Sequence, residues 1–198
     1  MARCGASAVA MAALLLLIAA ATPALAQPAS VTISGVTFGG NGCSWSNSEY
    51  SYSSNSKTIT FIFGGMVATT DGGLEDRRKV CQISMSISYP DGWTYTLGQV
   101  TGRGFADIAK GSQGIYETHF YFSGQTGTPR VSRILPGKFV DSFEFTDDFS
   151  TSVWSQCNNT PNLNIKSVVR VEGSQAVMAL DSSDTKFQLV YYFDWKEC

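Results

Sequence analysis

Apolar and polar residues alternate with a period of two along most of the chain, and helical periodicity is nearly absent. The clearest case is residues 81–89, where every second residue is apolar and the residues between are glutamine or serine. This pattern predicts a strand with one face toward a core and one toward water. Residues 90–92 then supply turn chemistry, and we expect residues 93–97 to follow as the hairpin partner.

The same alternation, or a short apolar run bounded by turn residues, predicts further strands at 31–38, 58–63, 115–122, 139–145, 164–172, 176–180 and 187–195. Turns at 173–174 and 181–184 would make the last strands a terminal meander, and a one-turn helix is expected near 105–110. The serine-rich residues 44–56 are interpreted as a long polar loop or an edge hairpin. Eight to ten short strands predict an all-β fold, a single antiparallel β-sandwich of jelly-roll or immunoglobulin-like type.

The first 26 residues have the composition of a secretory signal peptide. Arg3 provides the positive start, residues 11–21 form an apolar run, and residues 24–26 (Ala-Leu-Ala) place small residues before a cleavage site. We therefore expect cleavage after Ala26 and a secreted, extracellular domain at 27–198. A membrane anchor is disfavoured because the apolar run is short and nothing similar follows it.

Four cysteines remain once Cys4 leaves with the signal peptide, and an even number in an oxidising compartment predicts two disulfides. They are Cys43, Cys81, Cys157 and Cys198. Their spacing alone allows three pairings, and without a CxxC motif it does not suggest a zinc-thiolate site. The only N-glycosylation sequon begins at Asn158, so we predict a glycoprotein where the host modifies secreted proteins.

Composition narrows the function further. Of the 198 residues, 43% are hydrophobic and 15% charged, with a formal net charge of −2, which suits a folded globular chain. Near-neutral charge provides no general attraction to nucleic acid or to an anionic membrane, so we expect neither partner. A single histidine excludes multi-histidine metal sites within one chain. We expect a monomer with no metal and no other cofactor.

That histidine, His119, lies on the predicted strand 115–122, on the face shared with Glu117 and Tyr121. It could be a general base oriented by Glu117. A surface histidine beside a glutamate on an exposed sheet face is the simpler interpretation, and we favour it. Serines are plentiful, but no GxSxG motif supports a catalytic triad.

An acidic stretch contains Asp141, Glu144, Asp147 and Asp148. Paired carboxylates there could perform glycoside hydrolysis, and a Ca²⁺ site is another interpretation. The surrounding aromatic residues favour a strand that leads into a solvated loop. We therefore assign no catalytic residue and keep a carboxylate-dependent hydrolase as an alternative.

Aromatic side chains offer the main binding chemistry. Trp45, Tyr50 and Tyr52 lie in the serine-rich segment, and Tyr192 points away from the apolar face of the last strand. Exposed Trp and Tyr rings can stack on sugars, so these three residues of the serine-rich segment are the predicted glycan-stacking site. The other tryptophans adjoin predicted core or disulfide positions and are interpreted as packing residues: Trp93, Trp154 and Trp195.

These observations favour a non-enzymatic extracellular protein that binds a cell-wall or surface glycan or belongs to a matrix. A surface protein is the other partner we consider, and a secreted effector or inhibitor that binds a foreign protein is the alternative from a different class. An exposed apolar patch would favour that alternative.

Six short blocks along the chain resemble one family of small secreted proteins, seen mainly in fungi and some bacteria and catalogued as domain of unknown function 4360. The blocks are residues 39–43 (GGNGC), 79–83 (KVCQI), 89–93 (YPDGW), 120–124 (FYFSG), 154–157 (WSQC) and 195–198 (WKEC). The resemblance runs from about residue 31 to 198 and implies a secreted all-β domain. It also implies the pairs Cys43–Cys81 and Cys157–Cys198. It brings no activity, cofactor or catalytic residue.

Overall fold

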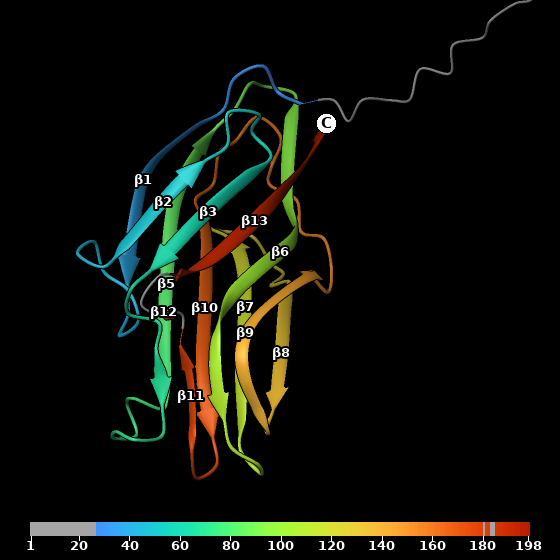
Figure 1. Ribbon diagram of the computed structural model, residues 1–198. Helices are drawn as coiled ribbons and strands as arrows, with labels where there is room; N and C mark the ends of the chain where they lie inside the picture. Colours follow the sequence, from blue (N-terminus) through green and yellow to red (C-terminus); the bar gives the residue numbers. More distant parts are fainter. Residues whose placement is uncertain (1–26, 180, 183–184) are drawn as a thin grey trace, which may run out of the picture.

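Two antiparallel sheets pack face to face in the computed structural model, which describes residues 27–179, 181–182 and 185–198 (Figure 1). Every regular element in the described part of the chain is a strand. The predicted signal peptide and residues 180, 183 and 184 of the predicted meander lie outside that part.

Sheet A has five strands in the order β1-β5-β10-β7-β8. Their bounds are β1 Thr32–Gly39, β5 Arg78–Ser88, β10 Leu163–Glu172, β7 Gln113–Phe122 and β8 Arg130–Pro136. Sheet B has eight strands in the order β2-β3-β13-β6-β11-β4, with β9 paired to β6 and β12 to β13. Their bounds are β2 Ser48–Tyr52, β3 Thr58–Phe63, β13 Thr185–Glu197, β6 Trp93–Ile108, β11 Ala176–Ala179, β4 Ala68–Thr69, β9 Phe139–Asp148 and β12 Asp181–Ser182.

The core lies between the sheets and follows the alternation in the sequence. On β5, Cys81, Ile83, Met85 and Ile87 are fully buried, and the residues between them are partly exposed. The facing sheet supplies Ile59 and other large apolar side chains of β3, β6 and β13. Period-two alternation therefore identified the buried faces correctly, and the predicted all-β sandwich is confirmed.

Two predicted strand pairings are wrong. The turn at 90–92 exists, with Gly92 at φ 82°, but β5 belongs to sheet A and β6 to sheet B. The start of β6 pairs with the end of β13, with Leu97 opposite Phe193. The turn at 173–174 likewise leads from β10 in sheet A to β11 in sheet B, so the terminal meander is not formed. Turn residues and alternation report a chain reversal and a buried face, but they do not report which strand lies alongside.

The one-turn helix predicted near 105–110 is also wrong, because β6 continues as a strand to Ile108. Phe105 pairs with Ser142 of β9 on one side and with Ala179 of β11 on the other. Two ladders of backbone hydrogen bonds override a weak local preference for a helical turn. The serine-rich segment forms β2, which pairs with β3 at the edge of sheet B and confirms the edge-hairpin interpretation.

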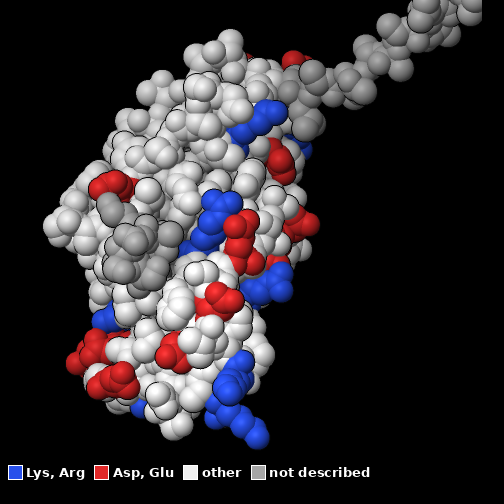
Figure 2. Space-filling view, viewed as in Figure 1, with Lys and Arg blue, Asp and Glu red and all other residues white. Residues whose placement is uncertain are grey.

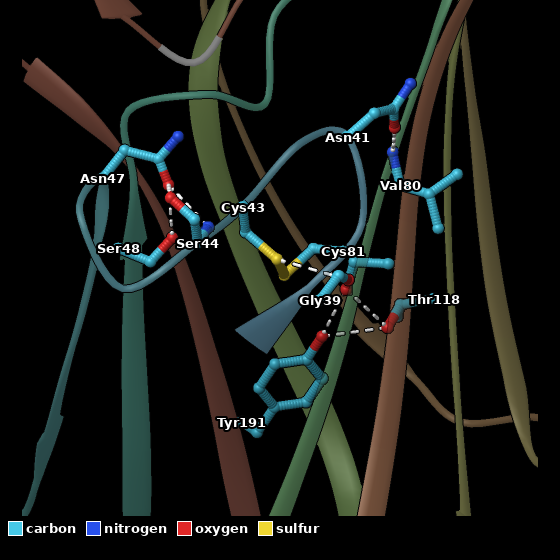
Figure 3. Close-up of a disulfide and its surroundings, with 11 residues drawn as sticks. Gly39, Asn41, Cys43, Ser44, Asn47, Ser48, Val80, Cys81, Thr118 and Tyr191 are labelled. Carbon is cyan, nitrogen blue, oxygen red and sulfur yellow. Dashed lines mark hydrogen bonds between the residues drawn. A yellow bond between two sulfur atoms is a disulfide. The ribbon is translucent and has the colours of Figure 1, made fainter. Parts of the chain in front are cut away.

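A buried cluster of three hydroxyl groups links the two sheets (Figure 3). The Tyr191 hydroxyl of β13 lies 2.9 Å from Thr118 Oγ1 of β7 and 3.0 Å from Ser167 Oγ of β10. Thr118 and Ser167 lie 3.2 Å from each other, and all three residues are almost completely buried. Polar groups in a dry core must bond to one another, so this cluster sets how the sheets pack.

Both disulfides have the pairing that the family resemblance implies. Cys43–Cys81 is buried and ties the segment after β1 to β5, while Cys157–Cys198 is exposed and ties the loop after β9 to the end of β13. The predicted pair of disulfides is therefore confirmed.

Candidate functional site

The three aromatic residues of the predicted stacking site differ in their surroundings. Trp45 is 60% exposed, and its ring meets Phe38 edge-on with a centroid separation of 5.0 Å. Tyr50 and Tyr52 extend from the core-facing side of β2 and contact the buried rings of Phe61 and Phe193. Trp45 thus presents an exposed ring supported by Phe38, whereas the two tyrosines pack against buried rings of the core.

A row of side chains crosses the outer face of sheet B. Strand register places Glu49 of β2, Ile62 of β3, Gln188 of β13, Arg103 of β6 and Glu144 of β9 side by side. Neighbouring strands lie about 4.8 Å apart, so this cross-strand row spans about 19 Å. Positions from five strands, spread over more than 130 residues of sequence, meet here only because of the sheet order.

The middle of the cross-strand row opens into a hollow of about 480 Å³, which we call the front groove. It is lined by Ile62, Arg103, Gly104, Ser142, Phe143, Glu144 and Gln188. A smaller adjoining hollow shares Ile62 and includes Trp45 and Glu49, so Trp45 lies near the β2 end of the row. Figure 2 shows basic and acidic side chains next to each other in the middle of this face.

Arg103 is the best-oriented polar side chain of the front groove. Its Nε donates to Glu144 Oε2 at 2.7 Å and its Nη2 to Oε1 at 3.3 Å, while Nη1 donates to Gln188 Oε1 at 3.3 Å. This pair raises the pKa of Arg103 and lowers that of Glu144, mainly through the hydrogen bond between them. A guanidinium has five N–H groups, so two have no partner among the described residues and can donate to a ligand.

The four acidic residues singled out in the sequence do not form a carboxylate pair. The predicted loop after residue 145 is wrong, since β9 continues to Asp148. Glu144 and Asp148 therefore point to the outer face, about 13 Å apart along the strand, and Asp141 and Asp147 point to the other face, about 20 Å apart. Glycosidases need carboxyl groups within ~5–9.5 Å on one face. These residues lack the geometry that the hydrolase alternative requires.

Three of these carboxylates have a side-chain partner, and the Oδ1 of the fourth, Asp141, accepts a hydrogen bond from the backbone N–H of Ser142 at 2.7 Å. Glu144 pairs with Arg103, Asp147 pairs with Arg133 of β8, and Asp148 accepts a hydrogen bond from the amide of Gln99. Among the described residues, no group of three His, Cys, Asp or Glu side chains is arranged to hold a metal ion.

His119 lies on the outer face of sheet A, half-buried, between two cations. The register places Lys166 of β10 on one side and Arg130 of β8 on the other. Burial lowers the pKa of His119, Arg130 and Lys166 lower it further, and Glu117 opposes them. A histidine flanked by cations is less readily protonated than a free one, and the opposing effect of Glu117 on its pKa is the smallest of the four.

A second hollow, of about 430 Å³, lies on the same face of sheet B toward the end of β13, and we call it the C-terminal hollow. It is lined by Gln27, Lys57, Trp154, Tyr192, Phe193, Asp194, Trp195 and Lys196. Alternation correctly predicted that Tyr192 faces outward. The contribution of Trp154 was missed, because nothing local indicates that the loop after β9 returns to this sheet.

The sequon residue Asn158 is exposed and occupies the left-handed region at φ 58°. Its Oδ1 accepts a hydrogen bond from the backbone N–H of Gly92 at 3.1 Å. Its glycosylation remains a prediction.

The family profile of domain of unknown function 4360 matches residues 29–198. The chain belongs to this family. A protein of Arthroderma benhamiae described as an uncharacterized secreted protein is 31% identical over 180 residues, which cover 87% of this chain and 74% of the relative. The family resemblance stated from the sequence blocks is therefore confirmed.

Two solved carbohydrate-binding modules are remote structural neighbours of this family member. TmCBM61, solved in complex with β-1,4-galactotriose, has a TM-score of 0.31 at 9% identity and covers 83% of this chain and 90% of its own. TmCBM27, described as recognising mannan, has a TM-score of 0.33 at 6% identity and covers 84% of this chain and 99% of its own. Among the described residues, no helix has the length and apolar character needed to span a membrane.

Proposed function

We propose that this protein is secreted, is processed after Ala26, and binds a glycan outside the cell through the front groove and Trp45, without transforming it. The observation that carries the proposal is Arg103, whose guanidinium is fixed by Glu144 and Gln188 with two N–H groups left for a ligand. Secretion is supported by the signal-like composition of residues 1–26 and by the secreted fungal relative.

The chemistry of the cross-strand row suits sugars. A sugar ring offers hydroxyl groups at its edge and an apolar face of C–H groups. Arg103, Gln188 and Ser142 can bond hydroxyl groups from fixed positions, and the indole of Trp45 offers a flat apolar surface near the β2 end of the row. Such a row suits an extended oligosaccharide that runs across the strands better than it suits a small compact ligand.

The protein-binding alternative has weaker support. The large apolar side chains that are exposed lie on separate strands and loops of both sheets: Trp45, Tyr50, Leu74, Ile134 and Val140. A protein interface usually needs a continuous apolar patch.

The test is retention of the mature protein on insoluble chitin, cellulose, β-1,3-glucan and mannan. We expect Trp45→Ala and Arg103→Ala each to weaken binding at least tenfold, or ~1.4 kcal/mol. The melting temperature should change by less than about 2 °C, since both side chains are exposed. Tyr50 and Tyr52 are unsuitable for this purpose because they pack against core rings.

Leu74→Ala is the matched control, since Leu74 is 84% exposed on the loop before β5 and lines neither the front groove nor the hollow beside Trp45. Its retention should equal that of the wild type. Failure of the intact protein to bind any of the four polymers would contradict the proposal, as would equal retention of Trp45→Ala and Arg103→Ala.

A further inference from the structure

The C-terminal hollow has walls suited to a ring-shaped ligand. Trp154 from the loop after β9 and Tyr192 from β13 line it, whereas Phe193 and Trp195, also in the lining, are buried and their rings pack in the core. Tyr192 lies near the hydroxyl of Thr101, which bonds Thr146 of β9 at 2.8 Å. The contact with Thr101 orients Tyr192, and Lys196 contacts the ring of Trp154.

Two ammonium groups stand at this hollow without a carboxylate partner. Lys57 and Lys196 are exposed, and neither forms an ion pair among the described residues, whereas Lys79 is paired with Asp76. The Lys196 Nζ lies 3.8 Å from the centre of the Trp154 ring, a cation–π contact between two residues of the lining.

Among the described residues of the lining, Asp194 is the single carboxylate, and it is directed toward Gly98 of β6. Its Oδ2 occupies the space where a side chain at Gly98 would begin, at the bulge between β6 and β13. Burial raises the pKa of Asp194, and the nearby Asp148 raises it further. The lysine charges at the hollow are thus only partly balanced.

From these features we propose that the C-terminal hollow is a second binding site, specific for a hexuronate unit of an acidic polysaccharide. The carboxylate of the sugar lies between Lys57 and Lys196, and the apolar face of its ring lies against Tyr192, since Lys196 already covers one face of the Trp154 ring. The net charge of the whole chain is −2, so long-range attraction does not explain binding of a polyanion, and retention reports a local site.

The experiment compares polygalacturonate with the same polymer after full methyl esterification, using the mature chain in affinity electrophoresis. Esterification removes the negative charge of the polysaccharide and leaves its sugar backbone unchanged. We expect binding of the acid form only, and its weakening between ~0.01 and ~1 M salt, where the Debye length falls from about 30 to about 3 Å. Equal retardation by both polymers would overturn the proposal.

The variant Lys57→Gln/Lys196→Gln should bind polygalacturonate at least tenfold more weakly, and Tyr192→Ala should weaken it as well. Lys110→Gln, single and combined with Lys138→Gln, removes the same charge elsewhere and should bind like the wild type. Equal losses in the lysine controls, or binding of dextran sulfate as tight as that of polygalacturonate, would indicate a nonspecific charge effect and refute the site.

The two proposed sites can fail separately. Retention on neutral polymers should be unchanged in Lys57→Gln/Lys196→Gln, and binding of polygalacturonate should be unchanged in Arg103→Ala. Loss of polygalacturonate binding in Arg103→Ala would indicate that the acidic polymer binds in the front groove. It would contradict the proposed site in the C-terminal hollow.

Discussion

His119 shows at the scale of one residue how neighbours on a sheet determine charge. Burial is the first cause of its lowered pKa, followed by Arg130 and Lys166. The folded state therefore binds a proton less readily than the unfolded chain, where the pKa is near 6.5. Because the unfolded state then binds more protons, this stability is present above that value and is lost as the pH falls from it through the lower pKa of the folded state.

Acidification should therefore lower the free energy of unfolding through His119. Between about pH 7.5 and 5 the wild type should lose more free energy of unfolding than His119→Gln, measured by urea denaturation at each pH. Glu117→Gln should lose more than the wild type, since Glu117 opposes the lowered pKa. Parallel pH curves for the three proteins would contradict the account.

At the scale of one element, β6 shows why a long strand is hard to recognise. Its alternation is interrupted by Gly98, Gly102 and Gly104. At Gly102 the ring of Phe145 from the neighbouring β9 occupies the place where a Cβ would lie. Gly102, which interrupts the alternation of apolar and polar residues in β6, is therefore the position where an aromatic ring of β9 packs.

Gly102→Ala should therefore force the Phe145 ring out of its position. Overpacking of this kind costs about 1–3 kcal/mol, which thermal or urea unfolding can measure. Gly39→Ala is the control, because nothing lies within 4 Å of its Cβ position and its backbone is not in the left-handed region. A loss as large in Gly39→Ala would mean that flexibility rather than packing explains the effect.

At the scale of the whole molecule, the two disulfides close loops of similar length, with sequence separations of 38 and 41. Loop-closure entropy alone predicts a similar stabilisation from each, about 4 kcal/mol. Their surroundings differ, because Cys43 and Cys81 are buried in the core and Cys157 and Cys198 are exposed.

Replacing both cysteines of a pair with serine separates these contributions. Loss of Cys43–Cys81 should lower the free energy of unfolding by more than loss of Cys157–Cys198, since it also places polar atoms in an apolar site. Chemical denaturation of the two double variants gives the comparison. Equal losses would indicate that chain entropy dominates at both positions.

Although it missed β8 and the second half of β6, the sequence by itself determined most of the strand segments and the side of each that faces the core. Residues such as Ile83 and Ser84 reveal this, because a side chain's face depends only on position along a strand and on the cost of burying polar groups. Family blocks supplied the disulfide pairing, which spacing left open. Trp45 and Tyr192 could also be singled out, since aromatic type and alternation are local properties.

Only the tertiary structure decided which sheet each strand joins and which residues meet across strands. Arg103 and Glu144 are 41 residues apart, and Trp154 and Lys196 meet from different segments. Pairing register depends on the packing of all strands at once, so no local pattern encodes it. For that reason the front groove and the C-terminal hollow emerged from the sheet order. The sequence had singled out Glu144, Trp45 and Tyr192, but not Arg103, Lys57 or Lys196.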